Sequence, residues 1–275
     1  MMTTMRVPMA LLSPVVGLAT LLTSCARPVE HASIPSVSSP RTSASAQHLS
    51  QPQRGAVAGP MDPDSRVGPI FLNGMAQHVC TGSVVHSATG NLVMTAAHCL
   101  AGASRITFVP GLAGDGPPSD LWTADAVYLD PRWTASKDPH ADYAIARVSS
   151  AAGGSVESHG LALTLGTAPP PGSRVTVMGY PSGVGGSPIG CQASTAVTES
   201  GYPSLSCEGL VGGTSGAPWV SGTTVTGLIG GLEGGGCAEN VSYSAPFDEH
   251  VAQLLARAEA GGPGDTVPNA VDDTC

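Results

Sequence analysis

Residues 212–218 read Gly-Gly-Thr-Ser-Gly-Ala-Pro and place one serine, Ser215, among three glycines just before an apolar pair. Glycine reaches positive φ without steric cost and lets other groups approach the main chain, so this run can form a sharp turn. A serine hydroxyl becomes a nucleophile only beside a base and beside N–H groups that face the oxyanion formed on attack. Alone, such a run is more often a glycine-rich turn between two strands than a catalytic site. The decision depends on partners elsewhere in the chain.

One histidine of this chain has an unusual setting. Residues 95–99 read Thr-Ala-Ala-His-Cys and follow an apolar segment. The two small residues before His98 would let the backbone pack tightly while the imidazole faces a cleft, and Cys99 could fix the loop covalently. A histidine at the end of a strand is more often structural than catalytic, but this setting favours a catalytic base.

The two motifs, in this order, resemble those of the chymotrypsin-like (trypsin-fold) serine peptidases. The likeness is greatest to the bacterial branch that includes the glutamyl endopeptidases and the actinobacterial trypsin-like peptidases, and it covers about residues 67–260. The resemblance implies an all-β fold of two six-stranded antiparallel β-barrels with a C-terminal α-helix. It also implies a serine endopeptidase, for which we expect no cofactor and no metal; the N-terminal segment and the cysteines described below predict that it is exported.

The family places an aspartate between the histidine and the serine, at the start of a strand. Asp142 fits this position, because it lies between the two motifs and is followed by alternating small and apolar residues. Asp130 and Asp138 lie nearby, but each precedes a proline and is typical of a turn. The alternative role for Asp142 is a cap at the entry of the strand.

The resemblance implies a mechanism residue by residue. Ser215 Oγ attacks a substrate carbonyl carbon, and His98 takes its proton and later gives it to the leaving group. Asp142 holds the imidazole tautomer and stabilises the imidazolium. The backbone N–H groups of Gly213 and Ser215 form the oxyanion hole, where removal of one donor costs about 10²–10³ in rate.

Departures from the animal enzymes narrow the expected specificity and control. Thr214 stands where those enzymes carry an aspartate, and no Ile-Val-Gly-Gly start is found near residue 67, so activation by a freed N-terminus is not expected. Gly209, followed by Leu210, replaces the acid of a trypsin pocket. Residues 227–231 hold no histidine of the kind that glutamyl endopeptidases place there. We therefore expect an apolar or small P1 side chain.

The composition is that of a turn-rich β protein. The 275 residues include 36 glycines and 24 prolines, and only 11% are charged, which disfavours long surface helices. One helix is expected over residues 247–259, where apolar residues recur at three- and four-residue spacing. About a dozen short apolar segments between turn residues predict strands. These segments are 67–73, 79–86, 92–97, 105–109, 122–129, 143–148, 174–179, 192–198, 204–208, 217–220 and 225–230.

The N-terminal part divides into segments of different composition. Residues 1–25 have a short basic start and an apolar stretch typical of an export signal, and they end in Leu-Thr-Ser-Cys. This ending resembles the lipobox of bacterial lipoproteins, which implies lipidation of Cys25; simple secretion is the alternative. Residues 26–66 are rich in Ser and Pro and predict a disordered tether, or else a pro-segment. The peptidase domain is expected over 67–262, followed by a polar tail over 263–275.

Six cysteines follow Cys25, and an even number suggests disulfides in an oxidising compartment. Their spacing is not that of a zinc site, and spacing alone leaves many pairings open. In the peptidase family, the cysteine beside the catalytic histidine pairs with one on the preceding strand. The expected disulfides are Cys80–Cys99 by this resemblance, Cys191–Cys207 across an expected hairpin, and Cys237–Cys275 by elimination.

Two other classes of function stay open. One is a catalytically silent trypsin-fold binding module on the cell surface, which the absence of a triad residue would favour. The other is an exported β-sandwich lipoprotein, which would require both motifs to be coincidental. The net charge of −9 and the scattered basic residues provide no basic face for nucleic acid. We expect a monomer that acts on protein or peptide substrates, with a lipid anchor at Cys25 as its only link to the membrane.

Overall fold

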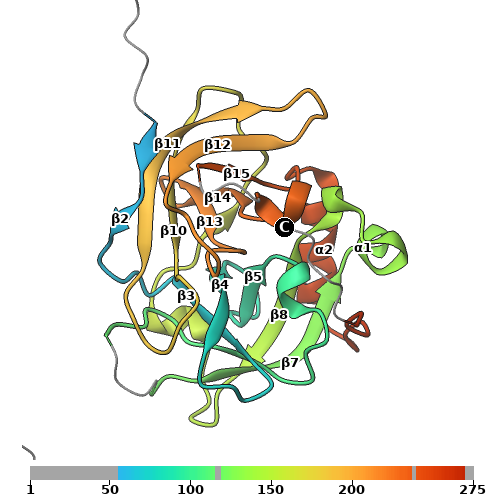
Figure 1. Ribbon diagram of the computed structural model, residues 1–275. Helices are drawn as coiled ribbons and strands as arrows, with labels where there is room; N and C mark the ends of the chain where they lie inside the picture. Colours follow the sequence, from blue (N-terminus) through green and yellow to red (C-terminus); the bar gives the residue numbers. More distant parts are fainter. Residues whose placement is uncertain (1–54, 115–118, 237–239, 270–275) are drawn as a thin grey trace, which may run out of the picture. The chain divides into compact units, whose positions relative to one another are not determined.

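The computed structural model describes residues 55–114, 119–236 and 240–269, which form two β-sheets and a helix near the C-terminal end (Figure 1). The expected signal segment, Cys25 and most of the predicted tether lie outside these residues. The predicted pair Cys237–Cys275 also lies outside them. Within the described part, no helix is both long and apolar enough to cross a membrane.

The first half of the fold is a closed barrel of six antiparallel strands, as the resemblance implied. Aliphatic and aromatic side chains suit a pleated, half-buried surface, and here they fill the barrel as one continuous cluster. In barrel order the strands are β3 (Val67–Leu72), β4 (His78–Val85), β5 (Leu92–Thr95), β8 (Ala144–Ser149), β7 (Trp122–Leu129) and β6 (Ile106–Phe108).

The register of β5 against β8 decides where two candidate residues lie. Thr95, the last residue of β5, pairs with Ala144, the first residue of β8. His98 lies three residues after Thr95, and Asp142 lies two residues before Ala144. The strand pairing therefore brings the histidine and the aspartate to the same rim of the barrel.

The second half is a nine-stranded sheet rather than six strands alone. Five of its strands, β10 to β14, lie on segments that the sequence predicts, and four short ones, β1, β2, β9 and β15, extend the sheet. Gly230 N–H donates to Tyr243 C=O over 3.0 Å, which brings two distant parts of the sheet together. The strands are β1 (Ala56–Val57), β2 (Gly59–Pro60), β9 (Thr164–Leu165), β10 (Arg174–Gly179), β11 (Ile189–Val197), β12 (Pro203–Glu208), β13 (Pro218–Ser221), β14 (Thr224–Leu228) and β15 (Val241–Tyr243).

The folded part begins earlier than the predicted boundary at residue 67. Residues 55–62, which we call the N-terminal arm, add β1 in parallel to β12 and β2 in antiparallel to β11. Ala58 N–H donates to Glu208 C=O over 2.7 Å, and Met61 N–H donates to Pro188 C=O over 2.9 Å. The arm is made of small residues with little hydrophobic pattern, so its order comes from the sheet edge that it joins rather than from its own propensity.

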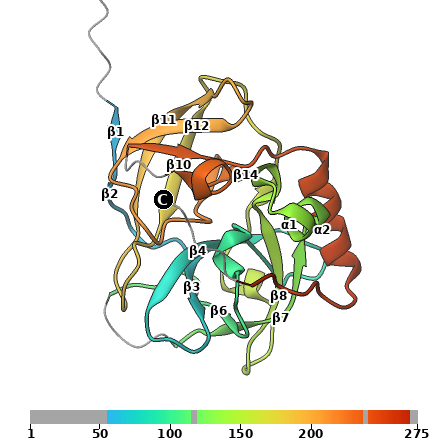
Figure 2. The same ribbon diagram turned by 45° about the vertical axis from the view of Figure 1, so that its right-hand side comes forward.

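The C-terminal helix is confirmed as α2 (Glu249–Ala260), and Figure 2 shows it beside β7 and β8. Its buried residues are Val251, Leu254 and Ala258, at the predicted spacing, and Asp248 caps its first turn. The tail that follows is held by backbone contacts of its own. For example, Asp265 N–H donates to the C=O of Val127 over 2.7 Å.

Short helices occupy the connections. Asp130 and Asp138, interpreted from the sequence as turn residues, cap a short helix and a 3₁₀ helix, and the proline after each occupies the first helical turn. Within the described residues the short helices are α1 (Pro131–Ser136) and the 3₁₀ helices His98–Leu100, Pro139–Ala141, Val156–His159 and Leu232–Gly235.

Asp130 also forms a buried charged cluster, which gives a testable stability prediction. Burial alone would raise the pKa of Asp130, but hydrogen bonds from Arg132 and from Tyr143, whose hydroxyl lies 2.6 Å away, lower it to about 2. A carboxyl whose pKa is lowered on folding stabilises the fold above its unfolded pKa of about 3.9, and this stability is lost as the pH falls toward 2. Replacing Asp130 with asparagine should therefore cost about 2 kcal/mol at pH 7.

Urea denaturation between pH 2 and 7 checks this prediction. The Asp130→Asn protein should lose less stability on acidification than the wild type, because it lacks one carboxylate that must be protonated. Asp125→Asn is the matched control, since Asp125 is exposed. The stability of the Asp125→Asn protein should depend on pH as that of the wild type does. Parallel curves for wild type and Asp130→Asn would contradict the prediction.

Candidate active site

The histidine and the aspartate that the sequence singled out are in direct contact. His98 Nδ1 lies 2.7 Å from Asp142 Oδ2, and His98 N–H donates to Asp142 Oδ1 over 2.9 Å. Gly231 N–H also donates to Oδ2, over 2.7 Å. The carboxylate, with 1% of its side chain exposed, therefore accepts from one ring nitrogen and two backbone groups.

These contacts keep the Asp142 carboxylate ionised and set the tautomer of a neutral His98 imidazole. Burial alone would raise the pKa of Asp142, but the charge and hydrogen bond of His98, with the two backbone N–H groups, hold it below its usual value. An ionised carboxylate only accepts hydrogen bonds, so the proton of the neutral imidazole lies on Nδ1. His98 Nε2 is then the basic nitrogen.

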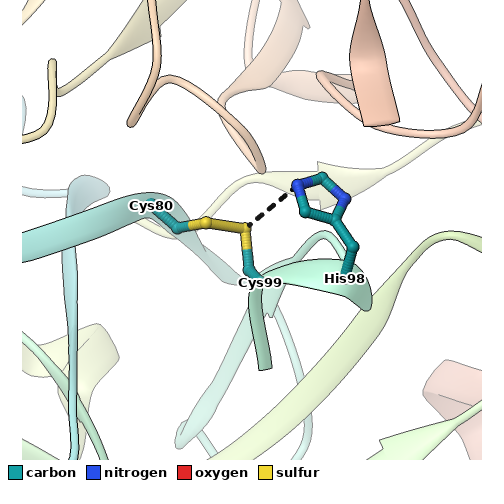
Figure 3. Close-up of side chains that lie close together, drawn as sticks. All are labelled: Cys80, His98 and Cys99. Carbon is teal, nitrogen blue, oxygen red and sulfur yellow. Dashed lines mark hydrogen bonds between the residues drawn. A yellow bond between two sulfur atoms is a disulfide. The ribbon is translucent and has the colours of Figure 1, made fainter. Parts of the chain in front are cut away.

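A disulfide lies beside the imidazole. Cys80 on β4 is bonded to Cys99, and Cys99 Sγ lies 3.8 Å from His98 Nε2 (Figure 3). The two sulfurs and the ring nitrogen are close enough together to surround a metal ion. Sulfurs joined in a disulfide are not thiolates, however, so this cluster lacks the ligands that a metal needs. Its effect is to fix the loop of His98 to β4.

Both predicted disulfides within the described part are confirmed. The second joins Cys191 on β11 to Cys207 on the neighbouring β12. Cys207 lies two residues before Gly209, and the chain then enters residues 212–218, which we call the serine loop. One disulfide thus fixes the segment of His98, and the other fixes the strand that leads to Ser215.

The serine loop needs two of its glycines for close approach. Gly213 has φ +96°, and a side chain there would meet Ser182 N at 2.1 Å. Gly216 has φ +81°, and a side chain there would meet Thr81 O at 2.2 Å. Both positions therefore require glycine, for conformation and for space. The half-buried Ser215 lies between them.

Contacts with the barrel bring the serine loop to the segment of His98. Thr81 N–H donates to Ser215 C=O over 2.8 Å, and Thr81 follows the disulfide-bonded Cys80. A side chain on Gly216 would lie 3.0 Å from the backbone nitrogen of Ala96, two residues before the histidine. The structure therefore places the loop of Ser215 against the barrel next to the segment of His98, and His98 itself contacts Asp142.

The carbonyls of the serine loop are fixed, and this orients its N–H groups. Gly212 C=O accepts from Ser182 N–H over 2.8 Å, and Thr214 C=O accepts from Ala217 N–H over 2.9 Å. In a trans peptide the N–H points away from the C=O. The N–H groups of Gly213 and Ser215 therefore each point away from the carbonyl of their own peptide. Neither N–H donates to another described residue. Two such N–H groups can bind an oxyanion.

The neighbourhood of the serine agrees with the departures noted in the sequence. Thr214 is buried, and its hydroxyl donates to Val211 C=O over 2.8 Å, so the loop is closed by a local contact in place of an ion pair. Leu210 is buried in the core of the second sheet. Neither residue provides a charge to a substrate.

Some site residues could not be found from the sequence. Gly231 holds Asp142 through its backbone N–H, and Ser182 holds Gly212 in the same way. A contact made by the main chain leaves no mark in the side-chain pattern. Thr81 uses its side chain, but a threonine is ordinary in a strand and gave no signal.

Comparisons with known proteins agree with this arrangement. A family model described as a trypsin-like peptidase domain matches residues 80–229, which include all three candidate residues. A search of curated proteins found no match.

Several solved structures have a similar fold. The protease Anisep from Arthrobacter nicotinovorans is 23% identical with a TM-score of 0.65, and the alignment covers 74% of this chain and 100% of that one. A Glu endopeptidase is 14% identical with a TM-score of 0.59, and the alignment covers 75% of this chain and 98% of that one. Human heparin binding protein is 16% identical with a TM-score of 0.61, and the alignment covers 77% of this chain and 100% of that one. At these identities the structures share the fold, and the chemistry must be argued from the site.

Proposed function

The chain belongs to the family of trypsin-like peptidase domains and is a serine-type endopeptidase, and from this premise we propose that it cleaves peptide bonds through His98, Asp142 and Ser215. The observation that carries the proposal is the contact between the Asp142 carboxylate and His98 Nδ1, 2.7 Å apart. This contact leaves Nε2 as the basic nitrogen, which is the state that a general base needs.

The proposed reaction has two steps. Ser215 Oγ attacks the carbonyl carbon while its proton passes to His98 Nε2, and the imidazolium is stabilised by Asp142. The developing oxyanion accepts from the N–H groups of Gly213 and Ser215. The proton then passes to the leaving amine, the C–N bond breaks, and an acyl-enzyme remains. Water, deprotonated by His98, releases the acid product and restores the serine, so the reaction uses no cofactor.

The proposed substrates are proteins or peptides with an apolar or small P1 side chain. Gly209 and Leu210 provide no charge where a trypsin pocket carries its acid, and β14 ends without the histidine of a Glu-specific pocket. An apolar pocket discriminates between side chains by size and by the cost of burying charge.

The proposed site of action is outside the cytoplasm. Two disulfides support export, because such bonds persist in oxidising compartments. Residues 1–25 would direct the chain there as an export signal. Lipidation of Cys25 would hold a monomeric enzyme at the membrane surface, with residues 26–54 as the tether.

Labelling with a fluorophosphonate probe tests the catalytic proposal. The purified full chain should form a covalent adduct on Ser215, located by mass spectrometry, and Ser215→Ala should form none. Ser182→Ala is the matched control, because it removes a nearby exposed hydroxyl and keeps the backbone N–H that orients Gly212.

Two outcomes would overturn the proposal. One is the absence of labelling in a folded wild-type protein, which would favour the catalytically silent binding module. The other is undiminished labelling of Ser215→Ala, which would place the reactive group elsewhere.

A further inference from the structure

Two threonines lie where the barrel meets the serine loop. Thr81 on β4 and Thr95 on β5 are buried, with 0% and 1% of each residue exposed. A buried hydroxyl needs hydrogen-bond partners, because an unpaired polar group inside the fold destabilises it. The partners of these two hydroxyls show what they hold in place.

Thr81 contacts the serine loop at two points. Its backbone N–H donates to Ser215 C=O over 2.8 Å. Its hydroxyl lies 3.0 Å from Gly213 C=O and 2.8 Å from Tyr180 N. Because a backbone N–H can only donate, the hydroxyl accepts from Tyr180 and gives its own proton to Gly213. One side chain thereby connects three segments.

The segment that begins at Tyr180 also contacts the serine loop. Ser182, two residues further along, donates its N–H to Gly212 C=O. The Thr81 hydroxyl therefore acts on the peptides on both sides of Gly213. It holds the following peptide directly, through Gly213 C=O, and the preceding peptide indirectly, through the segment from Tyr180 to Ser182.

Thr95 in turn fixes Thr81. Its hydroxyl donates to Thr81 C=O over 2.8 Å. A side chain on Gly216 would meet that carbonyl at 2.2 Å and the Thr95 hydroxyl at 2.3 Å, so the serine loop lies directly against both threonines. Thr81 is thus fixed by a hydrogen bond from β5, and its own hydrogen bonds fix the serine loop.

We propose that Thr81 is a positioning residue of the oxyanion hole, whose hydroxyl sets the direction of the Gly213 N–H. The proposal rests on the proposed function, since it concerns the same reaction. Thr81 does not touch the substrate; it acts through Gly213. Loss of its hydroxyl lets the peptide before Gly213 rotate, which weakens binding of the oxyanion formed during attack and leaves recognition of the substrate intact.

Inactivation kinetics with the fluorophosphonate probe on the full chain test this role. Thr81→Val keeps the shape of the side chain and removes the hydroxyl, and it should lower the rate constant of inactivation about 10- to 100-fold. The half-saturating probe concentration should change less than about twofold, because it reports binding before attack. Thr81→Ser, which restores the hydroxyl, should recover the rate to within about threefold of wild type.

A matched control separates positioning from general loss of stability. Thr195 is also buried, and its hydroxyl donates to Pro170 C=O over 3.0 Å in the second sheet. Thr195→Val should lower the unfolding temperature about as much as Thr81→Val and leave the inactivation rate unchanged. If Thr81→Val does not fold, Thr81→Ala compared with Thr81→Ser answers the same question.

The outcomes distinguish the two proposals. A wild-type chain that is not labelled removes the proposed function itself. A wild-type chain that is labelled, with Thr81→Val reacting at the same rate, overturns the positioning role alone. Equal rate losses in Thr81→Val, Thr81→Ser and Thr195→Val would also overturn it, because they would show a general effect on stability.

Discussion

Asp142→Asn is expected to lower kcat for peptide hydrolysis about 10⁴-fold while the protein stays folded. All three groups that face this side chain are donors: His98 Nδ1–H, His98 N–H and Gly231 N–H. A carboxylate satisfies them because both of its oxygens accept. An asparagine brings one NH₂ group, which must face either a backbone N–H or the ring nitrogen.

Each orientation of the introduced amide has a defined cost. With NH₂ at the position of Oδ2, the imidazole must turn to the other tautomer, so that Nε2 carries the proton and cannot accept from Ser215. With NH₂ at the position of Oδ1, two N–H groups face one another and the imidazolium loses its counter-charge. Both changes act on the transition state, so kcat should fall much more than KM rises.

A nearby carboxylate serves as the control for this experiment. Asp138 caps the 3₁₀ helix just before Asp142 and contacts His140. Asp138→Asn should keep kcat within about threefold of wild type, because the residue is not in contact with His98. Activity of Asp142→Asn within about tenfold of wild type would refute the assigned role.

Removal of the N-terminal arm is the second change with a large expected effect. A chain that starts at residue 67 should unfold about 10 °C lower than one that starts at residue 55 and should lose most of its activity. It lacks the pairing of β1 and β2 and the packing of Ala56 and Ala58 against the core of the second sheet. Each lost hydrogen bond costs about 0.5–1.5 kcal/mol, and the arm loses several of them at once.

The effect should reach the active site because the arm supports the strand before it. Ala58 N–H donates to Glu208 C=O, and Ala58 Cβ lies 3.7 Å from the position of a side chain on Gly209. The chain then continues into the serine loop. An inhibitory pro-segment over residues 26–66 predicts the opposite, namely higher activity after cleavage at residue 66. Thermal unfolding and probe labelling of chains that start at 26, 55 and 67 decide between these outcomes.

The sequence predicted the parts of the site that depend on side-chain identity. His98 and Ser215 each lie in a run of small residues with one reactive group, and Asp142 stands just before the apolar segment that forms β8. Their local settings carry the information, and strand pairing brings His98 and Asp142 to the same rim of the barrel. The disulfide Cys80–Cys99 followed from the same resemblance.

The sequence could not predict the parts that depend on the main chain or on a distant sheet edge. Strands β1, β2, β9 and β15 have two or three residues each, too few for a period-2 pattern to be visible. The supports given by Gly231 and Ser182 come from backbone N–H groups, whose direction depends on tertiary structure. Residues 26–66 share a composition that predicts a single segment, although the N-terminal arm within them joins the folded sheet.

The hydrogen bond from the Thr214 hydroxyl to Val211 C=O bears on the moment at which this enzyme becomes active. The described contacts that shape the serine loop arise from internal residues, from Thr81 to Ile229. We therefore expect the loop to take its shape during folding, before any cut near residue 66. Such an enzyme would need no upstream peptidase, and equal probe labelling of the chains that start at 26 and 55 would confirm this. The cell would limit its attack through the amount that it synthesises and through where the chain is allowed to fold.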